Sequence, residues 1–254
     1  MTVRVEKSGA VTTVILDRGE RRNAIDPATG VALRETFAAF DSDPDASVAV
    51  LWGEGGHFCA GFDLKEVSAH EPVHDPFGEG LIGPTRMLLT KPVIAAVEGY
   101  AVAGGLELSL WCDLRVAAEG ATFGVFCRRW GVPLIDGGTV RLPRIVGHAR
   151  ALDMILTGRP VGASEALAWG LANRVVPDGE ARAAAEALAA SIARFPQICL
   201  RADRMSAHLQ WGQDIAVALR EEAMRGERPL REEARAGASR FAGGLGRGGD
   251  FGAI

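Results

Sequence analysis

The chain has 254 residues, 48% of them hydrophobic, which is enough for one large domain with a substantial core. Its formal net charge is −4 with both signs mixed along the sequence, and this balance excludes a general nucleic-acid-binding protein. No segment is apolar for long enough to cross a membrane, and the N-terminus has no apolar signal core. We therefore expect a soluble, cytoplasmic protein without a membrane partner.

The cysteines are widely separated and form no CxxC pair; they are Cys59, Cys112, Cys127 and Cys199. This spacing predicts reduced thiols rather than a disulfide framework or a zinc site. His70 and His74 have no carboxylate at a ligand spacing, so no metal is expected.

The N-terminal part of the chain alternates between predicted strands and helices. A hairpin is predicted for residues 3–16. Asp26-Pro27 supplies an N-cap and a first helical residue, which predicts a helix from this point. Residues 48–52 read as a buried strand. Proline and glycine interrupt residues 68–83 repeatedly, and we expect a mobile loop there, a candidate lid over a site.

The most informative stretch is residues 93–114, which a short predicted helix at residues 84–90 precedes. Its first five residues are apolar and predict a buried strand. Small residues then crowd together up to Gly105, which predicts a sharp turn, and helical spacing follows with Glu107 in the first turn. A strand, a glycine turn and a helix start aim N–H groups at one spot, where an anion or a developing oxyanion can be held. A carboxylate beside that spot is a candidate acid or base.

The second half of the chain changes character. A strand is expected at residues 115–118, and a second glycine-bearing loop follows at residues 131–138. Beyond about residue 145 only helices are predicted, and this change is the one candidate boundary in the chain. The expected helices start near residue 139 and then cover residues 149–157, 164–169, 179–195 and 198–225. The tail, residues 236–254, is expected to be loosely ordered unless it docks on something.

Several motifs, in this order, resemble the crotonase, or enoyl-CoA hydratase/isomerase, superfamily. The central signature runs from Ile94 to Leu114 and includes the small triplet Ala103-Gly104-Gly105. Further matches are Arg22-Asn23-Ala24-Ile25, Phe58-Cys59-Ala60-Gly61-Phe62-Asp63-Leu64, Gly137-Gly138-Thr139, Arg141-Leu142-Pro143 and Leu156-Thr157-Gly158-Arg159. The resemblance covers the chain to about residue 180, and the combination is far more specific than any single motif.

The resemblance implies an α/β fold: a spiral of ββα units over residues 1–195 and a C-terminal helical region with its tail over residues 196–254. It also implies an enzyme acting on coenzyme A thioesters, in which two backbone N–H groups hold the thioester carbonyl oxygen. By position these belong to Phe62 and Gly104. The implied coenzyme A contacts are Arg22, Ala24, Ala60, Gly61, Phe62, Asp63 and Leu64. Coenzyme A would enter as part of the acyl-CoA or enoyl-CoA substrate, with no permanently bound cofactor, and the superfamily's usual assembly implies a homotrimer or hexamer.

Glu107 matches the first of the two catalytic glutamates of the hydratases, and the second position is occupied by Cys127. Two carboxylates add water by activating it and by protonating carbon, whereas a thiol with an ordinary pKa of about 8.5 is a poor substitute. Arg128 and Arg129 could stabilise a thiolate, but a small buried cysteine is the simpler reading. A reaction with one base, such as moving a double bond through Glu107, stays feasible.

Asp136, in the second glycine-bearing loop, is the rival second carboxylate. Some members of the superfamily place a working acid close to this position. The alternative is a turn aspartate that caps the helix expected near Thr139. We prefer Asp136 as the partner of Glu107.

The sequence thus predicts an enoyl-CoA hydratase or isomerase with Glu107, Asp136, Phe62 and Gly104 as its catalytic residues. Two alternatives stay open. The first is a coenzyme A ester-binding protein with a degenerate site, which Cys127 motivates. The second is another reaction of the superfamily, decarboxylation or thioester hydrolysis.

Overall fold

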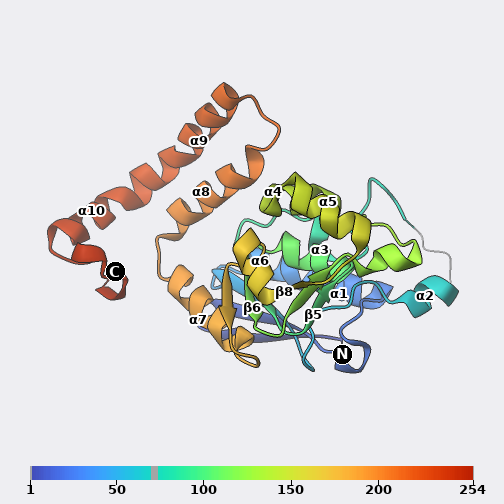
Figure 1. The fold of residues 1–254 in the computed structure, drawn as a ribbon. Coiled ribbons are helices and arrows are strands. Elements are labelled where there is room, and N and C mark those ends of the chain that lie inside the picture. Colours follow the sequence, from blue (N-terminus) through green and yellow to red (C-terminus); the bar gives the residue numbers. More distant parts are fainter. Residues whose placement is uncertain (1, 70–73, 254) are drawn as a thin grey trace.

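The computed structural model describes residues 2–69 and 74–253. Within these residues the larger sheet has six strands in the order β1-β2-β3-β4-β6-β9, and the smaller sheet has three in the order β5-β7-β8 (Figure 1). The predicted hairpin is confirmed, with antiparallel β1 and β2 joined at Gly9, whose φ is 56°. The strand bounds are β1 Val3–Ser8, β2 Val11–Leu16, β3 Val48–Gly53, β4 Val93–Val97, β5 Tyr100–Val102, β6 Leu114–Ala118, β7 Thr122–Gly124, β8 Val161–Gly162 and β9 Arg174–Val176.

The chain alternates between the two sheets, and this alternation builds the spiral. β4 lies in the larger sheet and β5, which follows it, in the smaller one; β6 and β7 repeat the step. Two isolated parallel bridges extend the second layer toward the N-terminal side, Cys59 with Ala101 and Ile25 with Phe62. Each turn of the chain therefore supplies backbone to both layers and then a helix. The α/β spiral expected from the sequence is confirmed.

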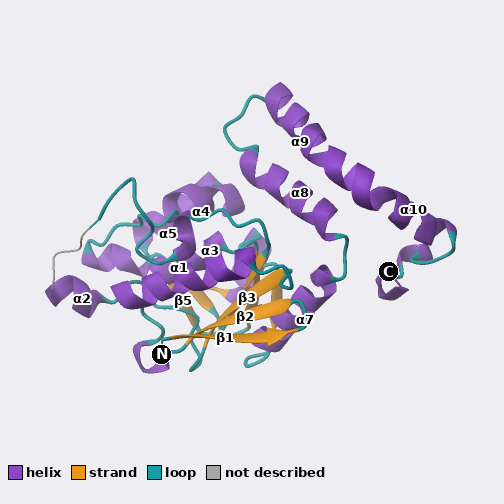
Figure 2. Ribbon diagram, turned by 180° about the vertical axis from the view of Figure 1, so that it is seen from behind, coloured by secondary structure: helices purple, strands orange, loops and turns teal. Residues whose placement is uncertain are grey.

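Helices cover both faces of the larger sheet (Figure 2). Successive residues of β3 point to opposite faces: Val48 and Val50 pack in the cluster that includes Ala185 of α7, while Ala49 and Leu51 pack with Phe37 of α1. The expected cap of α1 is confirmed, because Asp26 accepts a hydrogen bond from the Thr29 N–H at 2.8 Å. The helices of this part are α1 Pro27–Ser42, α2 Leu64–Ala69, α3 Gly104–Trp111, α4 Gly138–Val146, α5 His148–Thr157, α6 Ala163–Trp169 and α7 Ala181–Ala193.

Two predictions between β3 and β4 were wrong. Helix α2 occupies part of the segment expected to be loop, and the helix expected at residues 84–90 is only a 3-10 turn, Pro84–Arg86. The turn ends early because Met87 is already extended, with ψ at 142°. Residues 70–73 of the expected lid, including His70, lie outside the described residues.

The C-terminal helices are α8 Gln197–Leu209, α9 Ile215–Pro229 and α10 Arg235–Ala242, and they stand out from the rest of the molecule (Figure 1). The single helix expected at residues 198–225 was wrong, because Gly212 adopts φ 79° and Asp214 caps a new helix through the Ala216 N–H. The expectation of a loose tail was wrong for α10, which a π-turn, Leu230–Ala234, joins to α9.

The expected boundary between residues 195 and 196 falls in the connection between α7 and α8. The division into a spiral core and a helical region stays a prediction. No helix of the described residues is long and apolar enough to span a membrane.

Candidate active site

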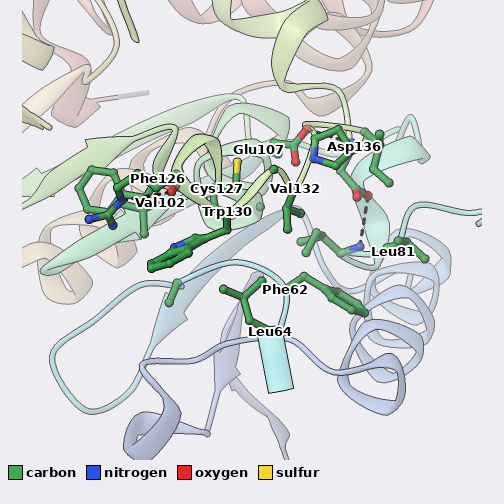
Figure 3. A pocket seen from close by; sticks show the side chains of 18 of the residues that line it. Phe62, Leu64, Leu81, Val102, Glu107, Phe126, Cys127, Trp130, Val132 and Asp136 are labelled. Atoms are coloured by element: carbon green, nitrogen blue, oxygen red, sulfur yellow. Dashed lines mark hydrogen bonds between the residues drawn. The ribbon is translucent and has the colours of Figure 1, made fainter. Parts of the chain in front are cut away.

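A cavity of about 680 Å³ is lined by the end of β5, the start of α3 and the loops that contain residues 60–64, 81–82 and 126–136 (Figure 3). Most of its lining side chains are apolar. It brings together seven residues predicted for the site: Arg22, Ala60, Phe62, Leu64, Gly104, Glu107 and Asp136. Ala24, Gly61 and Asp63 do not line it, although they lie in the same two loops.

The backbone at Phe62 leaves its N–H group unused. In the parallel bridge to Ile25, the Gly61 carbonyl accepts from the Ile25 N–H at 2.8 Å, and the Asp63 N–H donates to the Ile25 carbonyl at 2.8 Å. The N–H of Phe62 lies between these two bonds and points away from Ile25, as in any parallel pairing. It donates no hydrogen bond within the described residues.

Gly104 begins α3, so its N–H has no partner inside the helix. The preceding Ala103 is held at φ 53° and ψ −125°, a conformation that is costly for a residue with a Cβ atom. Gly61 lies against this helix start: a Cβ atom on Gly61 would come within 2.7 Å of the Gly104 nitrogen. A glycine at position 61, with φ 95°, therefore lets the Phe62 loop approach α3.

Glu107, in the first turn of α3, is only 2% exposed. Its Oε1 accepts hydrogen bonds from the N–H groups of Asp136 at 2.9 Å and Gly138 at 2.8 Å. Burial raises the pKa of this carboxyl to about 7, and the negative charge of Asp136 adds to the effect. A carboxyl with such a pKa can both accept and donate a proton near neutral pH.

Asp136 is equally buried, but its carboxylate is engaged elsewhere. Oδ1 accepts a hydrogen bond from the Ile82 N–H at 3.2 Å and a short one from the Thr85 hydroxyl (Figure 3 shows the first). It does not cap α4, whose N-cap is Gly137 without a side-chain bond, so the capping alternative was wrong. Asp136 instead joins the 131–138 loop to the 80–85 segment.

Cys127 lies in the 3-10 segment Phe126–Trp130, and its thiol lines the cavity on the same side as Glu107 (Figure 3). The side chain is 5% exposed. Burial raises the pKa of this thiol, the nearby Glu107 raises it further, and the charge of Arg128 opposes them less strongly. The alternative of a thiolate stabilised by the two arginines is therefore wrong. The small buried cysteine is confirmed, and its thiol is protonated.

Two loops that the sequence singled out are held by Arg18, which sequence reasoning did not name, and by Asn23 of the Arg22-Asn23-Ala24-Ile25 motif. Arg18 forms ion pairs with Asp26 at 3.1 Å and with Asp63 at 3.3 Å, and donates to the Ala24 carbonyl. Asn23, fully buried, donates to the carbonyls of Glu54 and His57. The Ile25–Phe62 bridge and the Arg18 ion pairs hold the 22–26 and 60–64 loops side by side, and both loops contribute residues to the cavity lining.

Arg141 and Thr85 are further residues of the site that sequence reasoning missed. Arg141 donates to the Asp136 carbonyl at 3.0 Å and to the Thr85 carbonyl. Its position in the Arg141-Leu142-Pro143 motif was a usable signal, whereas Thr85 lies 51 residues from Asp136 and has no local signal. Among the described residues no group of three His, Cys, Asp or Glu side chains could hold a metal ion.

Two unused N–H groups and a carboxyl at one cavity can hold a carbonyl oxygen and exchange a proton beside it. Together with the two-layer spiral, this arrangement is typical of enzymes that process thioesters. The sequence profile described as enoyl-CoA hydratase/isomerase matches residues 6–243. The chain belongs to the enoyl-CoA hydratase/isomerase family, within the crotonase superfamily, and is an acyl-CoA-processing enzyme of that type.

Named relatives and solved structures agree with this family. The enoyl-CoA hydratase EchA19 of Mycobacterium tuberculosis is 40% identical over 205 residues, 78% of this chain and 77% of that protein. The carnitinyl-CoA dehydratase of Proteus mirabilis is 41% identical over 197 residues, 76% of this chain and 75% of that protein. The crystal structure of enoyl-CoA hydratase EchA1 from Mycobacterium marinum superposes with a TM-score of 0.89 at 34% identity, covering 95% of both chains.

Proposed function

We propose that the cavity binds an α,β-unsaturated acyl-CoA thioester and that Glu107 catalyses the reversible addition of water to its double bond. The observation that carries this proposal is the buried carboxyl of Glu107, with a pKa of about 7, on the same cavity as two unused N–H groups. The names of the relatives, which are hydratases and dehydratases of coenzyme A esters, support the same reaction.

In the proposed mechanism the thioester carbonyl oxygen accepts hydrogen bonds from the N–H groups of Phe62 and Gly104. These donors polarise the double bond and stabilise the enolate that forms. Glu107 takes a proton from water as the hydroxyl oxygen bonds to the β-carbon. The same carboxyl then returns a proton to the carbon beside the thioester, so that water has been added across the double bond.

The remaining part of the substrate would lie along the two joined loops. Arg22 lines the cavity, and we propose that it contacts the coenzyme A phosphates together with backbone of Ala24, Ala60 and Gly61. Leu64 would pack against the pantetheine chain. The carboxylate of Asp63 is paired with Arg18, so its proposed contribution is to hold this loop in place. Coenzyme A is then part of the substrate, and no resident cofactor is required.

Asp136 is proposed to act on Glu107 rather than on the substrate. Its carboxylate is already bonded to the Ile82 N–H and the Thr85 hydroxyl, and its charge favours the protonated form of Glu107. Glu107 is then the one carboxyl proposed to exchange protons with the substrate.

The presence of Cys127 favours a second candidate reaction, isomerisation of a 3-enoyl-CoA to the 2-enoyl-CoA. A neutral thiol replaces the second carboxylate, and moving a double bond needs only one base. Glu107 would remove a proton from the carbon beside the thioester, and after the double bond shifts it would return the proton at the γ-carbon, or the reverse.

The experiment is a panel of trans-2-enoyl-CoA and 3-enoyl-CoA esters of increasing chain length, with 3-hydroxyacyl-CoA and 2-enoyl-CoA measured as products. Glu107→Gln keeps the Oε1 acceptor and should lower the rate by about 10²- to 10⁴-fold while leaving acyl-CoA binding intact. Glu180→Gln, at an exposed acid before α7, is the matched control. Binding without turnover of any ester would contradict the proposal and favour a degenerate coenzyme A ester-binding protein.

Assembly and location extend this proposal. We propose a homotrimer or hexamer, supported by the apolar side chains that α9 exposes in the single chain, among them Ile215 and Leu219. A cytoplasmic location stays a prediction from the sequence.

A further inference from the structure

The thiol of Cys127 differs from the other three in its surroundings. Cys59 accepts a hydrogen bond from the Gly61 N–H, Cys112 donates to the Leu108 carbonyl, and Cys199 contacts the Asp203 carboxylate. The Cys127 sulfur has only the backbone N–H groups of Cys127 and Arg128 beside it, and its S–H donates to no acceptor within the described residues. Of the four thiols it alone lines the cavity of the candidate site. A thiol whose proton has no acceptor within the described residues therefore faces the space where the substrate is proposed to bind.

The Glu107 carboxyl also borders this cavity. Both hydrogen bonds to the Glu107 carboxyl end on Oε1, and its other oxygen, Oε2, accepts none within the described residues, although the residue is only 2% exposed. Figure 3 shows the Cys127 sulfur and the Glu107 carboxyl on one side of the cavity, facing Phe62 and Leu64. A base and a thiol thus border one binding space.

We propose that Cys127 is a covalent capture site for α,β-unsaturated thioesters. Glu107 takes the thiol proton as the sulfur bonds to the β-carbon, and the electron pair of the double bond moves onto the thioester as an enolate. Glu107 then returns the proton to the carbon beside the thioester. The S–H bond has been added across the double bond without any oxidant or reductant, and the product is a thioether that still carries coenzyme A.

The inference rests on the proposed function, because the same two N–H groups must polarise the double bond. They stabilise the enolate whichever nucleophile attacks the β-carbon, water or sulfur. Burial keeps the thiol protonated, so the thiolate is scarce and the addition should be slow compared with turnover. The adduct reverses by the same path, since Glu107 can remove the proton that it delivered. Enoyl-CoA should therefore cause slow, reversible loss of activity.

The test uses trans-2-butenoyl-CoA with the full chain, an acid quench that stops the reverse reaction, and intact-protein mass spectrometry. We expect a slowly accumulating species heavier by the mass of one whole butenoyl-CoA, absent in Cys127→Ala and present in Cys199→Ala, which removes the exposed thiol. Circular dichroism establishes that each variant is folded. A peptide digest should place the added mass on Cys127.

A parallel measurement separates this inference from the function on which it rests. Hydration in D₂O places deuterium at the carbon beside the thioester whether or not sulfur reacts. Deuterated product without any added protein mass overturns the capture site and leaves the proposed function standing. An adduct that persists in Cys127→Ala also overturns it. If neither product nor adduct forms, both proposals fail.

Discussion

At the scale of single residues, the protonation of Glu107 is set by the groups packed around it. Burial dominates the raised pKa, the N–H groups of Gly138 and Asp136 oppose it, and the charges of Asp136 and Arg141 act in opposite senses. Cys127, the remaining titratable neighbour, stays neutral because burial raises its own pKa. A base that activates water must be ionised, so the hydration rate should fall as the pH drops below about 7.

Asp136→Asn tests this electrostatic assignment. The asparagine Oδ1 can still accept from the Ile82 N–H and the Thr85 hydroxyl, so the 80–85 segment keeps its anchor. Removing the negative charge should lower the pKa of Glu107, and the acid limb of the pH–rate profile should move to lower pH. A limb that stays in place while the rate collapses by several hundred-fold would show that Asp136 transfers a proton itself.

At the scale of elements, the site depends on loops held by a nearly buried ion-pair network. The side chain of Arg18 is 13% exposed and that of Asp63 is 11% exposed. Removing one member of such a network leaves an unpaired buried charge. Arg18→Met should lower the free energy of unfolding by about 3 kcal/mol and raise the KM for acyl-CoA, as measured by urea unfolding and steady-state kinetics.

The matched control is Arg159→Met, because Arg159 pairs with Asp153 and Glu165 at a solvated position. That change should cost no more than about 1 kcal/mol. Equal effects of the two substitutions would mean that the Arg18 network contributes no more than a surface pair.

Local sequence patterns predicted the helices and strands better than they predicted the contacts within the candidate site. The Asp26 cap, the buried strand at residues 93–97 and the glycine turn before Gly104 are encoded within a few residues each. The hydrogen-bond partners of Asp136, Thr85 and Ile82, are 51 and 54 residues away in the sequence, so no local pattern predicts them. The catalytic roles of Phe62, Gly104, Glu107 and Asp136 stay predictions, although the fold brings these residues to one cavity.

At the scale of the whole molecule, one carboxylate fastens the C-terminal helices to the spiral. Asp113, two residues beyond the end of α3, accepts from Arg204 and contacts His208 of α8, both at 2.8 Å, and it also accepts from the Val93 N–H. Beyond this contact α9 returns antiparallel alongside α8, and it leaves Ile215, Leu219 and Met224 exposed in the single chain (Figure 1). The sequence did not predict the break between α8 and α9, because a single turn at Gly212 interrupts an otherwise continuous helical pattern.

Sedimentation tests the proposed assembly. The protein should sediment as a homotrimer or hexamer, and Leu219→Glu should shift it toward monomer by placing a charge in an apolar contact. Arg220→Glu, at an exposed neighbour on the same helix, is the matched control. A monomer at micromolar concentration would contradict the assembly and leave the site within one chain unaffected.

The most direct test of the central claim is a crystal structure with a bound acyl-CoA. The account predicts that the thioester oxygen lies about 3 Å from the nitrogens of both Phe62 and Gly104, with Oε2 of Glu107 against the carbon beside the thioester. A thioester oxygen bonded to neither nitrogen, or an acyl chain that leaves Glu107 without contact, would contradict it.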